Sequence, residues 1–509
     1  MAQLYRFHGG LPLDGRKGRL PFEPIRQAPL PALLCLPLRM HARGRLAPCV
    51  VPGQRVRRFE VLARPEDRGG ACLNAPAAGV IEAIEPRGLP HAPGEVDLAI
   101  LLRVDAEHPL AALPFTPIAD WPERSPAELR TRLVEAGVAG LGGAVFPTAD
   151  KLAQPCDTLI LNGAECEPWI ACDERLLAEC AEDVLRGGLL LRHVLGAQRV
   201  RVAIEDSMTP AREALIAALA CIESDALELV EVPTRYPQGG ERQLIEVLTG
   251  REVPLGGLPQ DLGIVVHNVG TAAAAWRAVV HGEALVERVV SVTGPGVAVP
   301  ANWRVAIGTP IADVIAASGD YTDSAQRLVM GGGMMGVSLP DDGFPIVKAS
   351  TCVLVLDAAS ARPVEDPLPC IRCGDCAEVC PPRLLPQLLH ESLRSDDIED
   401  AAGLGLEACI ECGLCDFACP SHIPLVQGFR SGKTRLKLVR RKTLEAQQAR
   451  ERYEARTDRL EREKEELAAR RAEAGKQAAS RAAIAAAIAK AKARSSAKPA
   501  ESAREDEAP

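Results

Sequence analysis

The sequence is poor in aromatic residues and contains no long apolar run. Phe, Trp and Tyr together make up 3% of the chain, although 47% of its residues are hydrophobic, so its cores are expected to rely on Ala, Val, Leu and Gly. No stretch reaches the roughly 18 consecutive apolar residues that a membrane-spanning helix needs. The first residues contain no apolar segment of the kind that a secretory signal requires. We therefore expect a chain that is soluble, or that other proteins hold at a membrane.

The formal charge of −9 is modest and unevenly distributed. From Ser431 onward, 21 Lys and Arg residues stand against 13 Asp and Glu residues, which leaves the tail with +8 and residues 1–430 with −17. An acidic body argues against nucleic acid as the main partner. The basic tail suits an acidic subunit, a lipid surface or plain solvation.

The cysteine content indicates metal ligation rather than disulfide bonding. The chain has 17 cysteines in 509 residues, an odd total, and no secretory signal is expected. Nearly half of them are concentrated in the segment 370–419. The others are isolated and predicted to be mostly small buried apolar groups.

Two copies of one motif account for this concentration. The pattern C-x2-C-x2-C-x3-C-P occurs first at Cys370, Cys373, Cys376 and Cys380, and again at Cys409, Cys412, Cys415 and Cys419. Three thiolates at two-residue gaps bind three corners of a [4Fe–4S] cube, and in two-cluster ferredoxins the fourth ligates the other cube. We therefore expect Cys419 to complete the first cluster and Cys380 the second. A pair of structural zinc sites is the alternative, but zinc knuckles do not usually carry a third and fourth Cys at this spacing followed by Pro.

The length of the chain and its changing patterns predict a multidomain protein of α/β and β units. We expect six segments: an arm at 1–30, a small all-β, barrel-sandwich-like domain at 31–115, an α/β domain at 116–285, a small α+β unit at 286–362, a two-cluster domain at 363–431, and a charged helix with a disordered tail at 432–509, the disorder starting near Gly475. No Lys lies between Arg58 and Glu82 to carry a prosthetic group. A structural role is therefore the simplest interpretation of the β domain.

Alternating strands and helices predict a mostly parallel sheet in the segment 116–285. Ser125 and Glu128 form a capping box around Pro126, which predicts a helix start. Apolar strands are expected at 158–162, 200–204, 229–232 and 262–266, with helices near 174–195, 209–220, 241–249 and 272–281. In such sheets ligands bind at the carboxyl ends of the strands.

Gly-rich and polar segments follow these strands and indicate a cofactor site. Glycines at 140, 142 and 143 allow a ligand to approach the backbone closely, and Lys151 supplies a positive charge for a phosphate. Clusters accept single electrons whereas nicotinamides give two as hydride, so a chain that uses both needs a flavin between them.

Four segments carry a family resemblance: GLGGAVFPTADK (140–151), NGAECEP (162–168), YPQGGERQLIEVLTGREVP (236–254) and NVGTA (268–272). They resemble the FMN- and NADH-binding subunit of respiratory complex I. Together with the paired ferredoxin motifs, they are most similar to the RnfC/RsxC family of the Rnf/Rsx electron transport complexes, over roughly residues 31–470. The resemblance implies a Rossmann-like α/β domain, a β-grasp (SLBB-like) unit at 286–362 and a ferredoxin-like domain.

The resemblance also implies cofactors and residue roles. FMN, NAD(H) and two [4Fe–4S] clusters are expected. The FMN phosphate and ring would be lined by Gly140, Gly142, Gly143, Ala144 and Lys151. Asn162, Asn268 and Thr271 would hydrogen-bond the flavin, and Phe146, Glu165 and Glu241 would lie near the nicotinamide dinucleotide. No general acid or base is needed, because hydride passes directly between stacked rings.

Two positions depart from the complex I pattern: Val145 replaces a Gly and Ala164 replaces an Asp.

The resemblance implies a peripheral subunit on the cytoplasmic face of a bacterial inner membrane, with other subunits of an ion-translocating complex and a ferredoxin-like protein as partners. A soluble reductase with the same core, such as a cobalamin reductase of bacterial microcompartments, is one alternative. A redox scaffold that binds clusters without turning over NADH is another.

Overall fold

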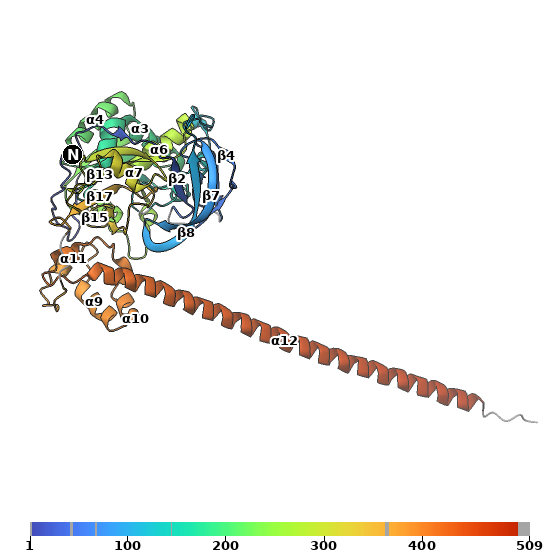
Figure 1. Ribbon diagram of the computed structural model, residues 1–509. Helices are drawn as coiled ribbons and strands as arrows, with labels where there is room; N and C mark the ends of the chain where they lie inside the picture. Colours follow the sequence, from blue (N-terminus) through green and yellow to red (C-terminus); the bar gives the residue numbers. More distant parts are fainter. Residues whose placement is uncertain (1–2, 41–43, 67–68, 144, 362–365, 497–509) are drawn as a thin grey trace, which may run out of the picture. The chain divides into compact units, whose positions relative to one another are not determined.

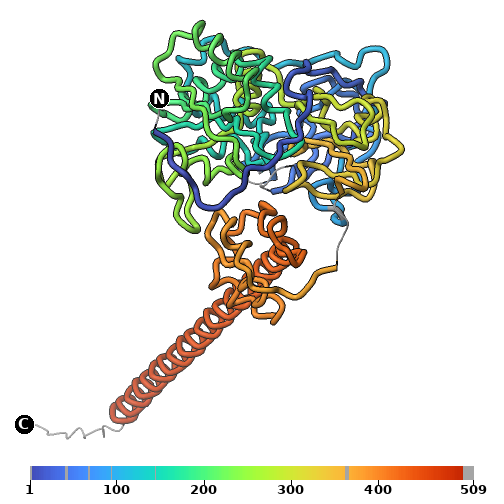
Figure 2. The backbone as a smooth tube through the Cα atoms, turned by 90° about the vertical axis from the view of Figure 1, so that its left-hand side faces the viewer, coloured from blue at the N-terminus to red at the C-terminus, as the bar shows by residue number. Residues whose placement is uncertain are grey.

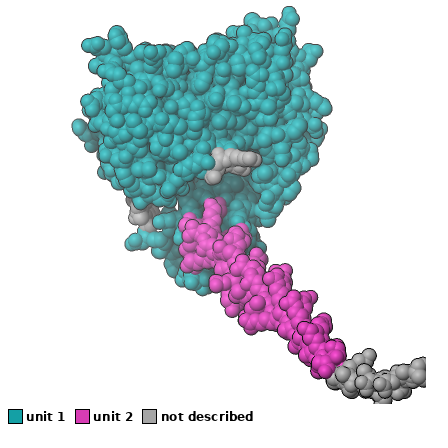
Figure 3. Space-filling view, turned by 90° about the vertical axis from the view of Figure 1, so that its right-hand side faces the viewer, with its two compact units in different colours: residues 1–432 teal, residues 433–509 magenta. Residues whose placement is uncertain are grey.

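The computed structural model describes residues 3–40, 44–66, 69–143, 145–361 and 366–496 (Figure 1). The chain divides into two compact units, residues 1–432 and 433–509 (Figure 3). The predicted multidomain α/β and β fold is confirmed, and the first unit contains all of the predicted site residues that the structure describes.

The N-terminal arm is extended and lies along the first unit (Figure 2). The backbone of Leu11 forms an antiparallel bridge with Tyr236. Further along, β1 (Arg26–Gln27) pairs in parallel with β14 (Ala301–Ala306). The amide of Gly10 donates to the carbonyl of Val379. The arm therefore joins segments that are far apart in the sequence.

The first domain is all-β, as the short apolar runs predict. One sheet has the order β2 (Leu33–Pro37), β8 (Ala92–Val104), β7 (Gly79–Leu89), β4 (Arg55–Val56), and a second contains β3 (Leu46–Pro48), β5 (Val61–Pro65) and β6 (Leu73–Asn74). Leu34, Leu36, Leu62 and Ile100 are fully buried, so alternate residues of these strands face one core.

The α/β domain has a four-stranded parallel sheet in the order β11 (Leu227–Val232), β10 (Arg199–Glu205), β9 (Thr158–Asn162), β12 (Ile264–Asn268). Its helices are α1 (Pro126–Glu135), α2 (Thr148–Lys151), α3 (Cys172–Leu195), α4 (Thr209–Cys221), α5 (Glu241–Thr249) and α6 (Val269–Trp276), followed by a π-helical turn at Arg277–His281. The predicted strands and helices are confirmed to within a few residues at each end. The Ser125 side chain accepts from the amide of Glu128, as the capping box predicts.

Helices α3 and α6 pack closely because of one glycine. A Cβ atom on Gly187 of α3 would lie 2.0 Å from the carbonyl oxygen of Ala272 in α6. Only a residue without a side chain allows this approach. The contact sets the position of α6 and therefore of the loop that precedes it.

The α+β unit extends a mixed sheet in the order β1, β14, β13 (Glu287–Thr293), β17 (Cys352–Asp357), β15 (Ala325–Met330), β16 (Val337–Ser338), with helix α7 (Ile311–Ala317). Strands β13 and β17 are parallel and central, and β14 and β15 are antiparallel to them. This arrangement agrees with the predicted β-grasp.

The two cysteine motifs lie among short helices: α8 (Asp375–Glu378), α9 (Pro386–Arg394), α10 (Ile398–Gly403) and α11 (Leu414–Ala418). Helix α12 (Leu425–Ser495) follows. The prediction that order ends near Gly475 is wrong, because α12 continues for a further 20 residues. The segment after Gly475 is rich in Ala, which has the highest helix propensity, so low complexity there does not mean loss of helix. No helix in the described part of the chain is long and apolar enough to cross a bilayer.

Candidate functional site

The carboxyl edge of the parallel sheet brings the polar segments together. Asn162 and Asn268 end neighbouring strands β9 and β12 and are paired in register. The amide nitrogen Nδ2 of Asn162 donates to the carbonyl oxygen of Gly239 at 2.8 Å. Segments that are far apart in the sequence thus meet at one edge, as the strand pattern predicts.

The glycine loop at residues 140–143 is fixed by hydrogen bonds on one side and has open space on the other. The amide of Gly140 donates to the carbonyl of Phe146 at 2.8 Å, and the amide of Leu141 donates to the Thr271 hydroxyl at 2.9 Å. A Cβ atom on Gly143 would meet nothing within 4 Å, and one on Gly142 would only touch Asn268 at 3.7 Å. The loop therefore presents an open backbone face.

Val145 does not obstruct that face. Its φ is +41°, in the left-handed region that favours glycine, and its side chain is buried beside Ala71 and Ala139. The replacement of Gly by Val is therefore accommodated on the inner side of the loop. Ala144 lies outside the described residues.

Lys151 lies at the same edge, on the last turn of α2. Its ammonium group is 2.7 Å from the carboxylate of Glu241 and donates to the carbonyl of Val266 at 3.1 Å. Neighbouring His267 is buried, and burial together with the charge of Lys151 lowers its pKa to about 3. His267 is therefore neutral at physiological pH, and Lys151 carries the positive charge of this edge.

Two predicted residues have internal partners. The Glu165 carboxylate is buried and accepts from the amides of Asp173 and Glu174 and from the Cys172 thiol, so it caps the N-terminus of α3. Asn268 caps α6 by accepting from the Gly270 amide.

These two caps are connected. The Nδ2 of Asn268 donates to Asp173 at 2.5 Å. Burial and the negative charge of Glu165 raise the pKa of Asp173 to about 7. The caps give both side chains a structural role at the edge where the sequence predicts cofactor contacts.

Sequence reasoning missed a group of buried charges beside these caps. Lys17, from the arm, lies 3.3 Å from the carboxylate of Glu174. Glu205 ends β10, is 1% exposed, and neither of its carboxylate oxygens has a partner among the described residues. Burial raises the pKa of Glu205 to about 7. The only signal in the sequence was that Glu205 directly follows the predicted strand 200–204.

The two cysteine motifs line two separate cavities. One is lined by Cys370, Cys373, Cys376 and Cys419. The other is lined by Cys409, Cys412, Cys415 and Cys380. The fold thus groups the thiols in the crossed manner that the motif spacing predicts. Burial raises the pKa of Cys380 to about 12 and that of Cys412 to about 11, so loading with metal must displace protons from these thiols.

Family models match four parts of the chain. The RnfC barrel sandwich hybrid domain matches residues 5–107, the Nuo51 FMN-binding domain residues 133–277, the SLBB domain residues 289–338, and the 4Fe-4S dicluster domain residues 369–423. Curated relatives, each named as the C subunit of an ion-translocating oxidoreductase complex, match most of the chain. The protein of Pseudomonas aeruginosa is 43% identical over 92% of this chain, and that of Serratia proteamaculans is 39% identical over 91%.

The chain belongs to the RnfC family of ion-translocating oxidoreductase complexes. It spans 61% of the length of the Pseudomonas aeruginosa relative and 65% of the Serratia proteamaculans relative. Two solved structures of an NAD+-reducing [NiFe]-hydrogenase, in the H2-reduced and the air-oxidised states, are similar at 22% identity, with TM-scores of 0.43 and 0.45. They cover 64% and 62% of this chain, and this chain covers 69% and 65% of theirs.

The cofactors of this RnfC-family chain are FMN and [4Fe–4S] clusters. The described residues fit FMN: the backbone face at Gly143 is open, Lys151 supplies a cation, and the amide nitrogen of Gln238 is buried without a partner among the described residues. Buried polar atoms are nearly always paired, so this amide marks a place for a missing acceptor. The two four-thiol cavities have the donor set that cubane clusters take.

One contact joins the flavin edge to a cluster cavity. The Tyr236 hydroxyl donates to the carbonyl oxygen of Cys412 at 2.7 Å. Tyr236 packs with Cys412, Leu414 and Met334 in one apolar cluster. In this member of the RnfC family, the cavity of Cys409, Cys412, Cys415 and Cys380 therefore adjoins the α/β domain.

Proposed function

We propose that this chain is the electron-entry subunit of a membrane-bound, ion-translocating oxidoreductase complex. In this proposal it exchanges electrons between NAD(H), FMN and two [4Fe–4S] clusters. The whole complex couples this exchange to ion movement and to the oxidation or reduction of a ferredoxin-like protein. The chain works as a peripheral subunit on the cytoplasmic face of the bacterial inner membrane. The names of the curated relatives favour this function over that of a soluble reductase.

The observation that carries the proposal is the junction of two redox sites in one chain. A glycine loop with an open face lies at the edge of the α/β sheet, and Tyr236 from that edge hydrogen-bonds a cysteine loop. FMN, when bound, accepts two electrons and can release them singly, which is the chemistry that links a nicotinamide to clusters.

The residues of this chain bind and orient in this proposal, and none acts as an acid or base. Lys151 holds the flavin phosphate by charge, and Gly142 and Gly143 let the ring approach the backbone. Glu241 holds Lys151 in place through the 2.7 Å ion pair. Glu165 and Asn268 set the starts of α3 and α6, which fixes the edge against which the flavin and the nicotinamide are placed.

The packing also supports an order for the clusters. Met334 and Tyr236 contact the loop of Cys412, whereas the described residues that line the cavity of Cys370 all lie between 370 and 425. The cluster on Cys409, Cys412, Cys415 and Cys380 is therefore proposed to receive electrons from the flavin. The cluster on Cys370, Cys373, Cys376 and Cys419 passes them to a partner.

Anaerobic titration with NADH tests the function. We expect loss of oxidised flavin absorbance followed by the EPR signals of reduced clusters, and an unchanged flavin spectrum would refute the proposal. Two variants test the order. Cys412→Ser is expected to keep flavin reduction but block reduction of the cluster on Cys370. The matched Cys373→Ser should leave the cluster on Cys412 reducible, and the reverse pattern would overturn the order.

A further inference from the structure

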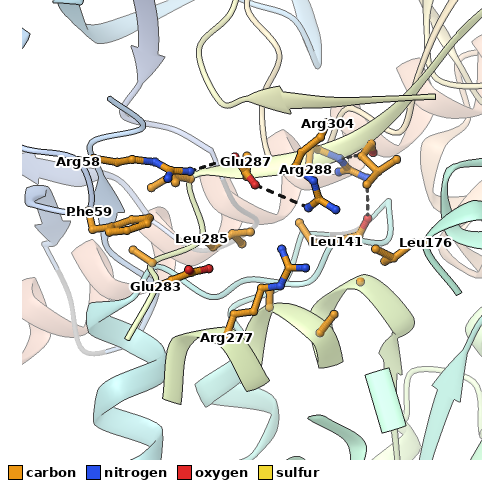
Figure 4. A pocket seen from close by; sticks show the side chains of 16 residues that line it. Arg58, Phe59, Leu141, Leu176, Arg277, Glu283, Leu285, Glu287, Arg288 and Arg304 are labelled. Atoms are coloured by element: carbon orange, nitrogen blue, oxygen red, sulfur yellow. Dashed lines mark hydrogen bonds and ion pairs between the residues drawn. The ribbon is translucent and has the colours of Figure 1, made fainter. Parts of the chain in front are cut away.

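Clustered arginines of the first unit have acidic partners within the fold. Arg58 and Arg304 both approach Glu287, at 3.0 and 3.6 Å, beside a small cavity that Arg277 also lines (Figure 4). Arg277 itself pairs with Asp183 at 3.0 Å. The positive charge of this cluster is therefore largely neutralised inside the fold, in contrast to the charge at the end of the C-terminal helix.

Helix α12 changes in character at Gly475. Before this residue, acidic and basic side chains are mixed along the helix, and Arg441, Arg450 and Arg459 each form an ion pair with the Glu four residues later. The part of the helix at 475–495, which we call the basic segment, contains no Asp or Glu. Its cations are Lys476, Arg481, Lys490, Lys492 and Arg494.

Most cations of the basic segment have no acid near them on the helix. The last four, from Arg481 to Arg494, each lie at least seven residues from the nearest acids in the sequence, Glu473 and Glu501. Ion pairs on a helix surface form between residues three or four apart, so the helix offers these cations no partner of its own. Every residue of the segment is exposed. The segment therefore presents uncompensated positive charge at its surface.

Two isoleucines lie in a row with two of these cations. Arg481, Ile484, Ile488 and Lys492 follow one another at intervals of three, four and four residues, which places them along one face of the helix. Ile484 is 58% exposed and Ile488 is 54% exposed. They are the only large apolar side chains of the basic segment, which otherwise consists mostly of Ala. The row therefore has an apolar centre and a cation at each end.

Such a row is suited to the surface of an anionic bilayer. Isoleucine side chains can enter the boundary between headgroups and acyl chains, while the long stems of Arg and Lys let their charges reach the phosphates. A second copy of the helix is a poorer occupant, because it would bring like charges together. Nucleic acid attracts cations but needs no exposed isoleucine, and the net negative charge of residues 1–430 repels it.

We propose that the basic segment binds the surface of a membrane that contains anionic lipids. Its cations bind the lipid phosphates, and Ile484 and Ile488 insert between the headgroups. The inference rests on the proposed function for the presence of a membrane, and it gives the peripheral subunit a direct contact with lipid. Lipid binding needs no NADH, and reduction of the flavin by NADH needs no lipid, so each can fail without the other.

Co-sedimentation of the cofactor-loaded full chain with lipid vesicles tests the proposal. Vesicles of phosphatidylcholine with one-third phosphatidylglycerol should bind the chain, and the binding should weaken as the salt concentration rises. Vesicles of phosphatidylcholine alone should bind at least tenfold more weakly. The double variant Arg481→Gln, Lys492→Gln should weaken binding to the anionic vesicles at least tenfold. The double variant Ile484→Ala, Ile488→Ala should weaken it at least threefold, although Ala favours the helix.

The double variant Arg450→Gln, Arg459→Gln is the matched control. It removes the same charge from exposed positions of the same helix, where the arginines pair with Glu454 and Glu463. Its binding to the anionic vesicles should be unchanged. Helix content measured by circular dichroism, with flavin and iron contents equal to those of the unmodified protein, establishes that each variant is folded.

Three results would overturn the proposal. The first is equal binding to both kinds of vesicle, because the lipid charge would then play no part. The second is equal weakening by the control and by the Arg481 and Lys492 variant, because net charge rather than the basic segment would then account for binding. The third is unchanged binding by the isoleucine variant, because charge alone would then suffice and an acidic protein or a nucleic acid would be the better occupant.

Discussion

The hydroxyl of Tyr236 lies 2.7 Å from the carbonyl oxygen of Cys412, although 176 residues separate them in the chain. Tyr236 is the first residue of the segment 236–241, which contacts the carboxyl edge of the sheet through the hydrogen bond between Asn162 and Gly239. Cys412 belongs to the second cysteine motif. Both residues are buried, so the hydrogen bond is shielded from water. This contact makes the flavin edge and one cluster cavity parts of a single packed structure.

Replacement of Tyr236 by Phe tests this contact. The variant keeps the ring but leaves the buried carbonyl of Cys412 unpaired, which costs about 1–3 kcal/mol. We expect a lower melting temperature and an altered EPR signal from the cluster on Cys412, with the other cluster unaffected. Tyr321→Phe is the matched control, since the Tyr321 hydroxyl bonds Asp342 at an exposed site. Equal effects of the two variants would contradict the structural role of Tyr236.

The crossed grouping of thiols predicts which cluster each fourth cysteine affects. Cys419→Ser should disturb the cluster on Cys370, Cys373 and Cys376, because these four residues line one cavity. EPR of the reduced protein and iron analysis measure the effect. Cys221→Ser, at an exposed and isolated cysteine, should change neither signal. Damage limited to the cluster on Cys409 would show that each motif binds its own cluster.

Because the face of the glycine loop at Gly143 is open, a substitution there should weaken FMN binding without lowering the stability of the fold. Gly143→Ala places a methyl group where no atom lies within 4 Å. The melting temperature of the flavin-free protein should therefore stay the same, while the dissociation constant for FMN rises at least tenfold because the methyl group occupies flavin space. Flavin fluorescence titration measures the affinity.

Gly187→Ala provides the contrast. Its added Cβ would lie 2.0 Å from the carbonyl of Ala272, so it should lower the melting temperature by forcing α3 and α6 apart. If Gly143→Ala binds FMN with unchanged affinity, the open face is not the flavin site.

Glu205 predicts a pH dependence of stability. Its pKa is raised to about 7 from an ordinary value of 4.5, mainly by burial and by the charges of Glu165, Glu174 and Asp206, against the opposing effect of Lys17. The folded state therefore holds a proton that the unfolded state loses. The stability that this proton gives is present below about pH 4.5 and is lost as the pH rises through 7, on the order of 3 kcal/mol in all.

Glu205→Gln, which cannot ionise, should escape this loss. Its melting temperature relative to the unmodified protein should rise between pH 5.5 and pH 8. Glu228→Gln, at a side chain that is 40% exposed, serves as the control and should show no such trend. If the difference in melting temperature between Glu205→Gln and the unmodified protein is the same at pH 5.5 and pH 8, Glu205 does not titrate in this range.

Much of the fold was predictable because its signals are local. Strands 158–162 and 262–266 are apolar runs bounded by polar residues, and Ser125 and Pro126 mark a helix start within four residues. The grouping of Cys419 with Cys370 could also be predicted, since the motif spacing prevents the fourth thiol from reaching its own cube. The length of α12 could not, because low complexity and high helix propensity coincide after Gly475.

The position of the cofactor site at the sheet edge could be predicted from the sequence, but the contacts of its individual side chains could not. The sequence indicated that Asn162 and Asn268 meet at one sheet edge, and the register of β9 and β12 agrees. It did not indicate that Glu165 and Asn268 cap α3 and α6, because a cap depends on how a loop folds back on a helix.

By itself, the sequence determined the order of domains, the parallel sheet and the two cluster motifs, because each depends on spacing within a short segment. Only the tertiary structure decided which distant groups share a site. Lys17 reaches Glu174, Tyr236 reaches Cys412, and Arg58 and Arg277 face one cavity from different domains. Such contacts arise when separately formed units bury their surfaces against each other, and the charge or hydroxyl that each residue contributes acquires its partner only at that step.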